Sequence, residues 1–245
     1  MSALSEFADY VTTGANWEGR NGITQAVVDH VRLSVFAVAV GAVLAIPLAV
    51  FLGHVRRGGV VAVAVVNIGR AIPTFAIVAL ALPFSLRWGF GLGFWPSAVA
   101  LVLLAIPPIF TNTYTGVRDV DPGVVESARG MGMRGSEVLI RAELPNALPL
   151  IITGLRVSAV QVVATATLAT LVGYGGLGSL VVRGMAQRDD GKLLTGAVLV
   201  ALLAILTELL FGVAERRASP WRRRHRSLAD ELTRDVRPVE GAPIA

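Results

Sequence analysis

The chain contains no cysteine, so it can form neither disulfides nor thiolate-bound metal sites. Charged residues are also scarce: they make up 16% of the 245 residues, whereas a soluble domain carries about 25%. Hydrophobic residues account for 54% and are concentrated in long runs. This composition is typical of a polytopic membrane protein. The net charge of +5 comes from arginines at the ends of those runs rather than from a soluble basic face, so we expect no nucleic-acid partner.

The N-terminus lacks the pattern of a cleavable signal peptide. Its first 22 residues carry acids where a signal is basic, and they contain no apolar core of roughly 7 to 15 residues. We expect residues 1–24 to form an N-terminal segment outside the cell and residues 25–215 to form the membrane domain. Residues 216–245 have no apolar periodicity, and we expect a basic, disordered cytoplasmic tail.

Crossing a bilayer takes about 20 predominantly apolar residues as a helix. Five runs are long enough, and they cover residues 33–53, 59–86, 94–116, 146–172 and 193–213. The second contains Pro73 and Pro83, so we expect one kinked helix with an irregular outer end; if residues 59–93 folded as two helices, the count would be six. The sequence therefore predicts an all-α polytopic membrane protein with five, possibly six, transmembrane helices.

The arginines predict the orientation of these spans, because basic residues gather in short cytoplasmic loops. They cluster after the first, third and fifth spans, at Arg56, Arg57, Arg118, Arg129, Arg134, Arg141, Arg216, Arg217, Arg222, Arg223, Arg224 and Arg226. We therefore expect a multi-pass protein of the plasma membrane whose N-terminus is outside and whose C-terminus is cytoplasmic.

Residues 172–175, Val-Gly-Tyr-Gly, match the core of a potassium-channel selectivity filter. Such a filter follows a short pore helix between two full spans, but one apolar stretch of 27 residues, enough for a single span, precedes Val172 here. Leu171 also replaces the filter threonine, which argues against a channel. The glycines instead suit an irregular segment at a helix end. We expect Gly173, Tyr174, Gly175 and Gly176 to contribute to an outer gate followed by a short surface helix; an ordinary glycine-rich connection is the alternative.

The charged segment between the third and fourth spans, residues 121–145, is called the elbow below. Asp121 and Pro122 are typical of a helix start, and Gly130 and Gly132 would end that helix. Ser136 can cap a second short helix that runs to Glu143, with Pro145 ending it.

One face of the elbow's first helix is apolar. Val124, Ala128 and Met131 follow one another at i, i+4 and i+7. An exposed apolar edge with a methionine at its tip suits a surface that repacks against a partner. The elbow is therefore predicted to be a docking surface.

The elbow resembles the EAA loop of ABC-transporter permease subunits. The family pattern is Glu-Ala-Ala, three residues, Gly, nine residues, Ile, one residue, Leu-Pro, and this chain departs from it at Ser127 and Ala142. The resemblance implies an α-helical importer membrane domain whose coupling helix contacts a cytoplasmic ATPase. The coupling residues that it implies are Glu126, Ser127, Ala128, Met131, Gly132, Leu144 and Pro145.

The resemblance covers roughly residues 25–215 and narrows to the permeases of osmoprotectant importers. Ile72-Pro73-Thr74 and residues 173–184 are similar to that branch, although Tyr174 stands where a small residue is usual. The implied substrates are glycine betaine, choline, carnitine or proline betaine; a methionine or other amino-acid importer is the alternative. The implied partners are ATPase subunits, a second permease subunit, identical or related, and an external solute-binding protein. The chain has no phosphate-binding loop with Lys and Ser/Thr, so ATP and magnesium would bind the partner ATPase, and this chain would carry no cofactor, no metal and no catalytic residue.

Polar residues inside apolar spans are functional candidates. We expect Asn67, Thr74, Gln161 and Thr165 to line the substrate pathway, and Arg156 to pair structurally with Glu208. Arg70 is expected at a helix end. The cluster Trp88, Phe90, Phe94 and Trp95 could form an aromatic cage, but an interfacial belt is favoured. His30, His54 and His225 are expected outside the spans, which speaks against a metal-dependent intramembrane enzyme.

Overall fold

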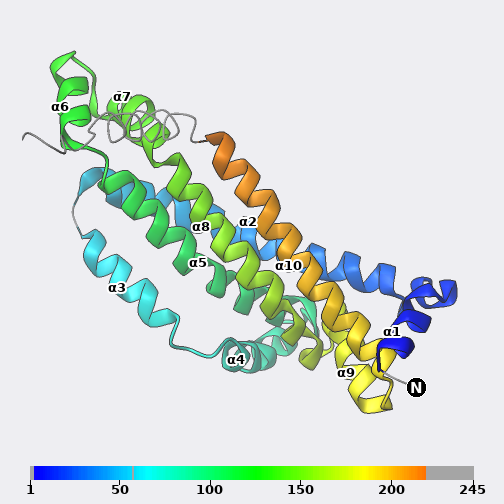
Figure 1. Cartoon of the computed structure of the whole chain (residues 1–245). Helices are drawn as coiled ribbons and strands as arrows, with labels where there is room; N and C mark the ends of the chain where they lie inside the picture. Colours follow the sequence, from blue (N-terminus) through cyan, green and yellow to red (C-terminus); the bar gives the residue numbers. More distant parts are fainter. Residues whose placement is uncertain (1–2, 57, 219–245) are drawn as a thin grey trace, which may run out of the picture.

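The computed structural model describes residues 3–56 and 58–218, which form an elongated helical bundle with the elbow at one end and the N-terminal helix at the other (Figure 1). The predicted disordered tail lies outside the described residues from residue 219 onward. Four long helices build the bundle: α2 (Ile23–Val55), α5 (Phe94–Arg118), α8 (Leu144–Thr165) and α10 (Asp190–Ala218). The shorter helices are α1 (Ala3–Thr12), η1 (Gly14–Trp17), α3 (Gly59–Gly69), α4 (Thr74–Arg87), α6 (Pro122–Gly130), α7 (Gly135–Val138), η2 (Leu139–Glu143), η3 (Ala166–Val172) and α9 (Leu177–Gln187).

The second predicted span is broken rather than gently kinked. Its halves, Val61–Gly69 and Thr74–Arg87, meet at 81°. Pro73 causes the break because it has no N–H to donate and disfavours helix in the residue before it. Arg70 lies at the C-terminal end of α3, as expected of a helix terminus. Within the described residues four helices are long and apolar enough to span a membrane, and the broken pair brings the total to five.

Helix ends depart from the apolar runs. α2 begins ten residues before its run, and α8 is part of a continuous helical stretch of 38 residues, Gly135–Val172. The prediction that the histidines lie outside the spans was wrong for His30 and His54, which are both inside α2; His225 lies outside the described residues. Hydropathy ends a span at the first polar residues, whereas helical hydrogen bonding continues past them when they find partners. His30 is 1% exposed, and its Nε2 lies 2.9 Å from the carbonyl oxygen of Val163.

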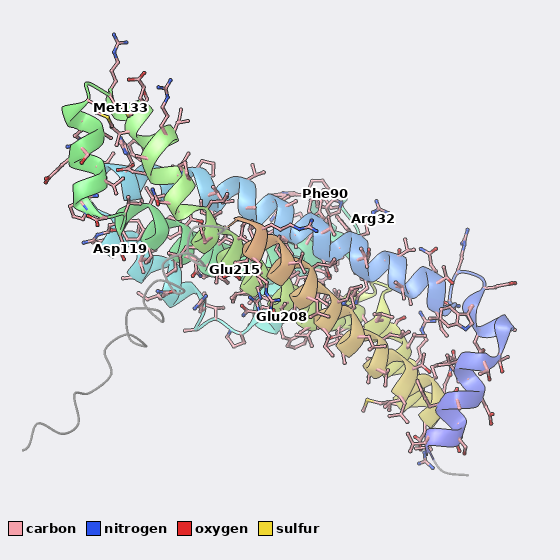
Figure 2. The ribbon with its side chains drawn as sticks, turned by 45° about the horizontal axis from the view of Figure 1, so that its top comes forward. Arg32, Phe90, Asp119, Met133, Glu208 and Glu215 are labelled. Carbon is pink, nitrogen blue, oxygen red and sulfur yellow. The ribbon has the colours of Figure 1, made fainter. Side chains whose placement is uncertain are left out.

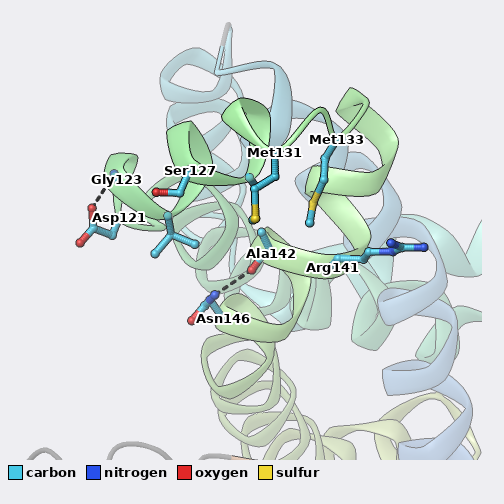
Figure 3. Close-up of a pocket in the computed structure, with 10 residues that line it drawn as sticks. Asp121, Gly123, Ser127, Met131, Met133, Arg141, Ala142 and Asn146 are labelled. Carbon is cyan, nitrogen blue, oxygen red and sulfur yellow. Dashed lines mark hydrogen bonds between the residues drawn. The ribbon is translucent and has the colours of Figure 1, made fainter.

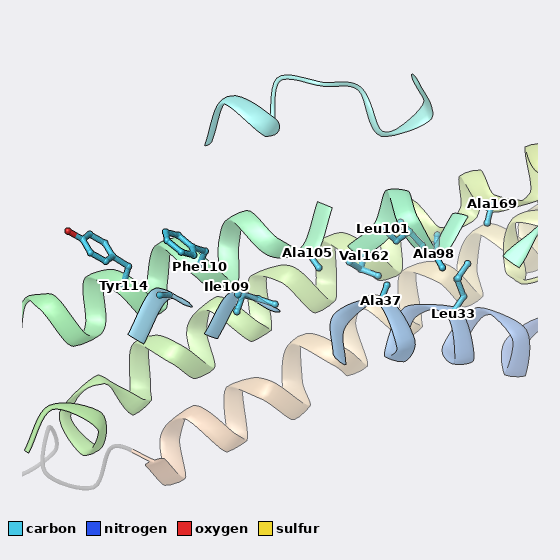
Figure 4. Packing of buried hydrophobic residues seen from close by; sticks show 13 residues of the cluster. Leu33, Ala37, Ala98, Leu101, Ala105, Ile109, Phe110, Tyr114, Val162 and Ala169 are labelled. Atoms are coloured by element: carbon cyan, nitrogen blue, oxygen red, sulfur yellow. The ribbon is translucent and has the colours of Figure 1, made fainter. Parts of the chain in front are cut away.

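The core of the bundle lies between α2, α5 and α8, as Figure 4 shows. α2 and α5 approach closely because small residues face each other: a Cβ added to Gly41 would lie 2.8 Å from that of Ala105, and one on Gly53 would lie 2.9 Å from that of Val117. Membrane helices associate through such close van der Waals packing, since lipid removes most of the hydrophobic drive. This rigid core carries the elbow at one end and the glycine-rich loop at the other (Figure 1).

Candidate functional site: the elbow and the opposite loop

The first elbow helix, α6, begins and ends as its sequence predicts. The Asp121 carboxylate accepts a hydrogen bond of 2.7 Å from the N–H of Gly123, and Pro122 occupies the first turn. The helix ends at Gly130, and Gly132 has a φ of +85°, where a residue with a Cβ is strained. The chain can therefore turn back towards the membrane spans.

The second elbow helix differs from the prediction in two ways. Ser136 does not cap it; Arg134 is the N-cap residue, and its N–H donates to the Glu137 carboxylate at 2.8 Å. Pro145 does not end it either, because the helix runs from α7 through the π-helical η2 into α8. The wider π-turn, in which the N–H of Leu144 donates to the carbonyl of Leu139, gives the proline ring room in a helix that it would otherwise interrupt.

A small apolar core of its own holds the elbow together. It consists of buried residues from the turn before α6 and from α6, α7 and η2: Val120, Val125, Ala128, Val138 and Ala142. Val138 is fully buried. This core is separate from that of the bundle, so the elbow is a compact unit with its own packing.

The elbow carries an open groove of about 480 Å³, drawn in Figure 3. Its lining residues are Asp121, Gly123, Val124, Ser127, Ala128, Met131, Met133, Arg141, Ala142 and Asn146. All three residues of the expected apolar stripe are among them. Ala128 is buried, Val124 is 42% exposed, and Met131 is 71% exposed. Figure 2 shows Met133 near the projecting tip of the elbow. An apolar groove with two flexible methionines suits a protein partner.

The structure brings only part of the predicted coupling set together. Ser127, Ala128 and Met131 share the groove, whereas Glu126 is exposed on α6 and is not part of its lining. Gly132 provides the turn beside it. Leu144 and Pro145 begin α8, and Leu144 packs against the Val117 cluster at the base of the elbow.

The predicted pathway residues fall into two groups. Asn67 and Thr74 flank the break in the second span, and the helices that hold them pack against α5. The side-chain oxygen of Asn67 is buried without a hydrogen-bond partner in the described chain. Gln161 and Thr165 are partly buried on α8. Their role as pathway residues stays a prediction.

At the opposite end, the glycine-rich loop is seated on α2 and α5. The Tyr174 hydroxyl donates to the Asp29 carbonyl at 3.1 Å, and its ring centroid is 5.8 Å from that of Phe94. Burial, and then the nearby Asp29 charge, raise the pKa of Tyr174. A Cβ on Gly175 would lie 2.9 Å from the Asp29 carboxylate, and Gly173 and Gly176 have φ values of +84° and +80°.

The short helix after this loop, α9, buries one face against the first span. Leu177 and Leu180 are buried, and they pack with Ile23 and Ala26 of α2. The loop and α9 together close this end of the bundle over the start of the first span (Figure 1).

The aromatic cluster forms a row of touching rings rather than an open cage. The centroids of Trp88 and Phe90 are 6.5 Å apart, those of Phe90 and Trp95 5.6 Å, and those of Trp95 and Phe94 5.4 Å. The Arg32 guanidinium lies 5.7 Å from the Phe94 ring centroid, so this ring already makes a cation–π contact with a side chain of the protein. The arrangement favours the interfacial belt.

The predicted pairing of Arg156 with Glu208 is confirmed, and a second carboxylate joins it. Arg156 contacts Glu208 and lies 3.0 Å from the Glu215 carboxylate. Figure 2 places Glu208 and Glu215 along α10. Glu215 was not predicted as a partner, although the spacing of seven residues puts both carboxylates on one helix face.

Several helices that are long and apolar enough to span a membrane, one of them broken, together with a projecting two-helix elbow, define a polytopic α-helical membrane protein. The chain belongs to the family of binding-protein-dependent transport system inner membrane components, whose model matches residues 41–220. It is therefore a multi-pass membrane permease.

Among curated proteins, the chain is 35% identical over 212 residues to the carnitine transport permease protein OpuCB of Listeria monocytogenes, covering 86% of this chain and 94% of the relative. It is 37% identical over 192 residues to the choline transport system permease protein OpuBB of Bacillus subtilis (strain 168), covering 78% and 86%. An osmoprotectant import permease protein, OsmW of Salmonella typhimurium, is 32% identical over 74% of this chain and 84% of its own length.

Among solved structures, the fold is similar to that of the inward-facing MetNI methionine ABC transporter. The TM-score is 0.70 at 23% identity, over 80% of this chain and 96% of that one. An amino-acid ABC transporter crystallised with histidines gives a TM-score of 0.68 at 18% identity, over 86% and 98%. Because both identities are low, these likenesses establish the fold alone.

Proposed function

We propose that the chain is the permease subunit of an ATP-driven ABC importer for osmoprotectants such as glycine betaine, choline, carnitine or proline betaine. The observation that carries the proposal is the elbow, a compact unit with an apolar groove at one end of the spans. Relatives named for carnitine and choline transport, 35% and 37% identical over most of this chain, support the substrate class.

Energy for transport comes from partner chains in this proposal. Two cytoplasmic ATPase subunits bind ATP and magnesium and dock at the elbow groove through Ser127, Ala128 and Met131, with Glu126 beside it and Gly132, Leu144 and Pro145 shaping the bend. A second permease subunit completes the pathway, since five spans enclose little internal surface, and an external solute-binding protein delivers the solute. This chain then needs no cofactor or metal of its own. The N-terminus faces outward and the C-terminus inward, which puts the elbow on the ATPase side.

Substrate would pass Asn67, Thr74, Gln161 and Thr165 and be sealed from outside by Gly173, Tyr174, Gly175 and Gly176. The seating of Tyr174 on Asp29 supports a gate that opens when the first span moves. Each conformation must be favoured by contacts that the other lacks, and this hydrogen bond is one such contact for a closed outer end.

An importer of methionine or another amino acid is the second candidate, and the relatives at 35% and 37% identity favour the osmoprotectant assignment over it. The two are separated by reconstituting the complete transporter, including its ATPase and binding protein, in liposomes. We expect ATP-dependent uptake of labelled glycine betaine, choline or carnitine. Uptake of methionine alone would overturn the osmoprotectant assignment, and uptake without ATP would overturn the importer class.

A further inference from the structure

A buried carboxylate joins the elbow to the first span. Glu143 is the last residue of the π-helical η2, and its side chain is 1% exposed. One of its oxygens lies 2.5 Å from Nδ1 of His54, in the last turn of α2. Neither residue stood out in the sequence as a functional candidate.

The contact matters because Glu143 has little else to interact with. Within the described part of the chain, His54 is its side chain's hydrogen-bond partner. A buried carboxylate that loses its partner is strongly disfavoured, whereas removing both partners is much better tolerated. The histidine is 21% exposed and can be rehydrated, so the two residues are not equivalent.

The other contacts between α2 and the elbow near this pair are apolar, and apolar contacts have no preferred direction. Ile46 and Val50 of α2 pack with Leu139 and Leu144 around the Val117 cluster. Apolar contacts of this kind resist separation but tolerate sliding. A hydrogen bond requires a defined distance and angle, so the one between His54 and Glu143 fixes the register between α2 and the elbow.

His54 also lies against the start of the second elbow helix. A Cβ added to Gly135 would be 3.7 Å from His54 Nε2, so one edge of the imidazole lies beside the start of α7 while Nδ1 on the other edge contacts η2 through Glu143. The pair thus sits at the π-helical joint between elbow and spans, and π-turns are frequently found at functional positions.

We propose that His54 and Glu143 are positioning residues for energy coupling: their hydrogen bond makes the first span follow the elbow when the elbow is moved. The inference rests on the proposed function. The first span in turn holds the glycine-rich loop at its far end, through the hydrogen bond from the Tyr174 hydroxyl to the Asp29 carbonyl and through the packing of α9 against the start of α2. Motion at the elbow is thereby passed to the opposite end of the bundle.

The experiment compares three substitutions at His54 in the complete reconstituted transporter. Asparagine places an amide nitrogen where Nδ1 was, glutamine places one where Nε2 was, and alanine removes both. We expect His54→Asn to keep the number of solute molecules imported per ATP hydrolysed within about twofold of wild type. His54→Gln and His54→Ala should lower it about tenfold, the change expected for one lost hydrogen bond to a charged group.

A second comparison separates coupling from stability. His54→Ala should lower the melting temperature of the purified complex because it strands the Glu143 carboxylate, and adding Glu143→Ala should recover most of that loss. The double variant should still import about tenfold less solute per ATP, because the link is absent. Recovery of the import ratio together with stability would overturn the proposal, as would a wild-type ratio in His54→Gln and His54→Ala. Failure of the wild-type complex to transport would instead count against the proposed function.

Discussion

At the scale of single residues, backbone conformation matters more than contact at the tip of the elbow. Gly130 and Gly132 would each have open space around an added Cβ. Only Gly132 has a positive φ, +85°, so a side chain is strained there whatever the space. These two glycines, two positions apart, therefore form a matched test of the turn.

We expect Gly132→Val to insert normally but to uncouple ATP hydrolysis from uptake. The left-handed conformation costs an L-residue roughly 1–2 kcal/mol, and a branched side chain more, so the groove should lose its shape. Gly130→Val is the control and should leave the import per ATP close to wild type. Equal effects of the two substitutions would remove the argument from the turn.

The Arg156 cluster is a second residue-scale feature. One guanidinium faces the carboxylates of Glu208 and Glu215, which leaves the group with a net negative charge. The three side chains are between 29% and 43% exposed, so the interaction is partly screened by its surroundings.

We expect Arg156→Met to destabilise the purified protein because it leaves two carboxylates on α10 without a cation. Adding Glu208→Gln and Glu215→Gln should restore the melting temperature in detergent. If Arg156→Met melted like wild type, the ion cluster would not hold α8 and α10 together.

At the scale of elements, the existence of the membrane spans can be predicted from the apolar runs, but the residues at which the helices begin and end cannot. Long apolar runs indicate the number of spans, and Pro73 indicates where the second breaks. Local rules failed where tertiary packing or a neighbouring turn decides. Ser136 looked like a cap but Arg134 and Glu137 took that role, and Pro145 looked like a stop but the π-turn before it accommodates the ring.

The same reasoning explains what the sequence could and could not predict of the site. The elbow could be predicted because its motif, from Glu126 to Pro145, lies within one continuous stretch of sequence. The contact between His54 and Glu143 joins residues 89 positions apart, and such long-range pairs leave no trace in local spacing. Helical periodicity could have predicted Glu215, because it follows Glu208 by seven residues. It was not singled out because Arg216 and Arg217 come directly after it and mark the end of the span.

The packing of α9 under η3 offers a prediction at this scale. A Cβ on Gly178 would overlap the carbonyl oxygen of Thr167, which is backbone and cannot move aside alone. We therefore expect Gly178→Ala to lower the melting temperature of the protein and to reduce uptake by displacing α9. Gly69→Ala, where no atom lies within 4 Å of the added Cβ, is the control. Unchanged stability of Gly178→Ala would show that the loop is not seated as described.

At the scale of the whole molecule, the bundle is a rigid body that connects two candidate functional surfaces, one at each end. The elbow has its own apolar core and groove, while the glycine-rich loop and α9 are held by the start of the first span. α2, α5 and α8 connect them through a tightly packed core. Such a core transmits displacement rather than absorbing it, because close-packed interiors deform little.

The most direct test determines which end of the helical bundle the ATPase subunit binds. Because the chain has no cysteine, Met131→Cys in the groove and Leu4→Cys on α1, exposed by 71% and 75%, each provide a unique thiol. We expect a short bifunctional thiol cross-linker to join the Met131→Cys variant to a cysteine-bearing ATPase subunit in the active transporter, and to leave the Leu4→Cys variant unlinked. An active transporter in which the groove never cross-links to the ATPase, or in which the α1 position does, would contradict the account.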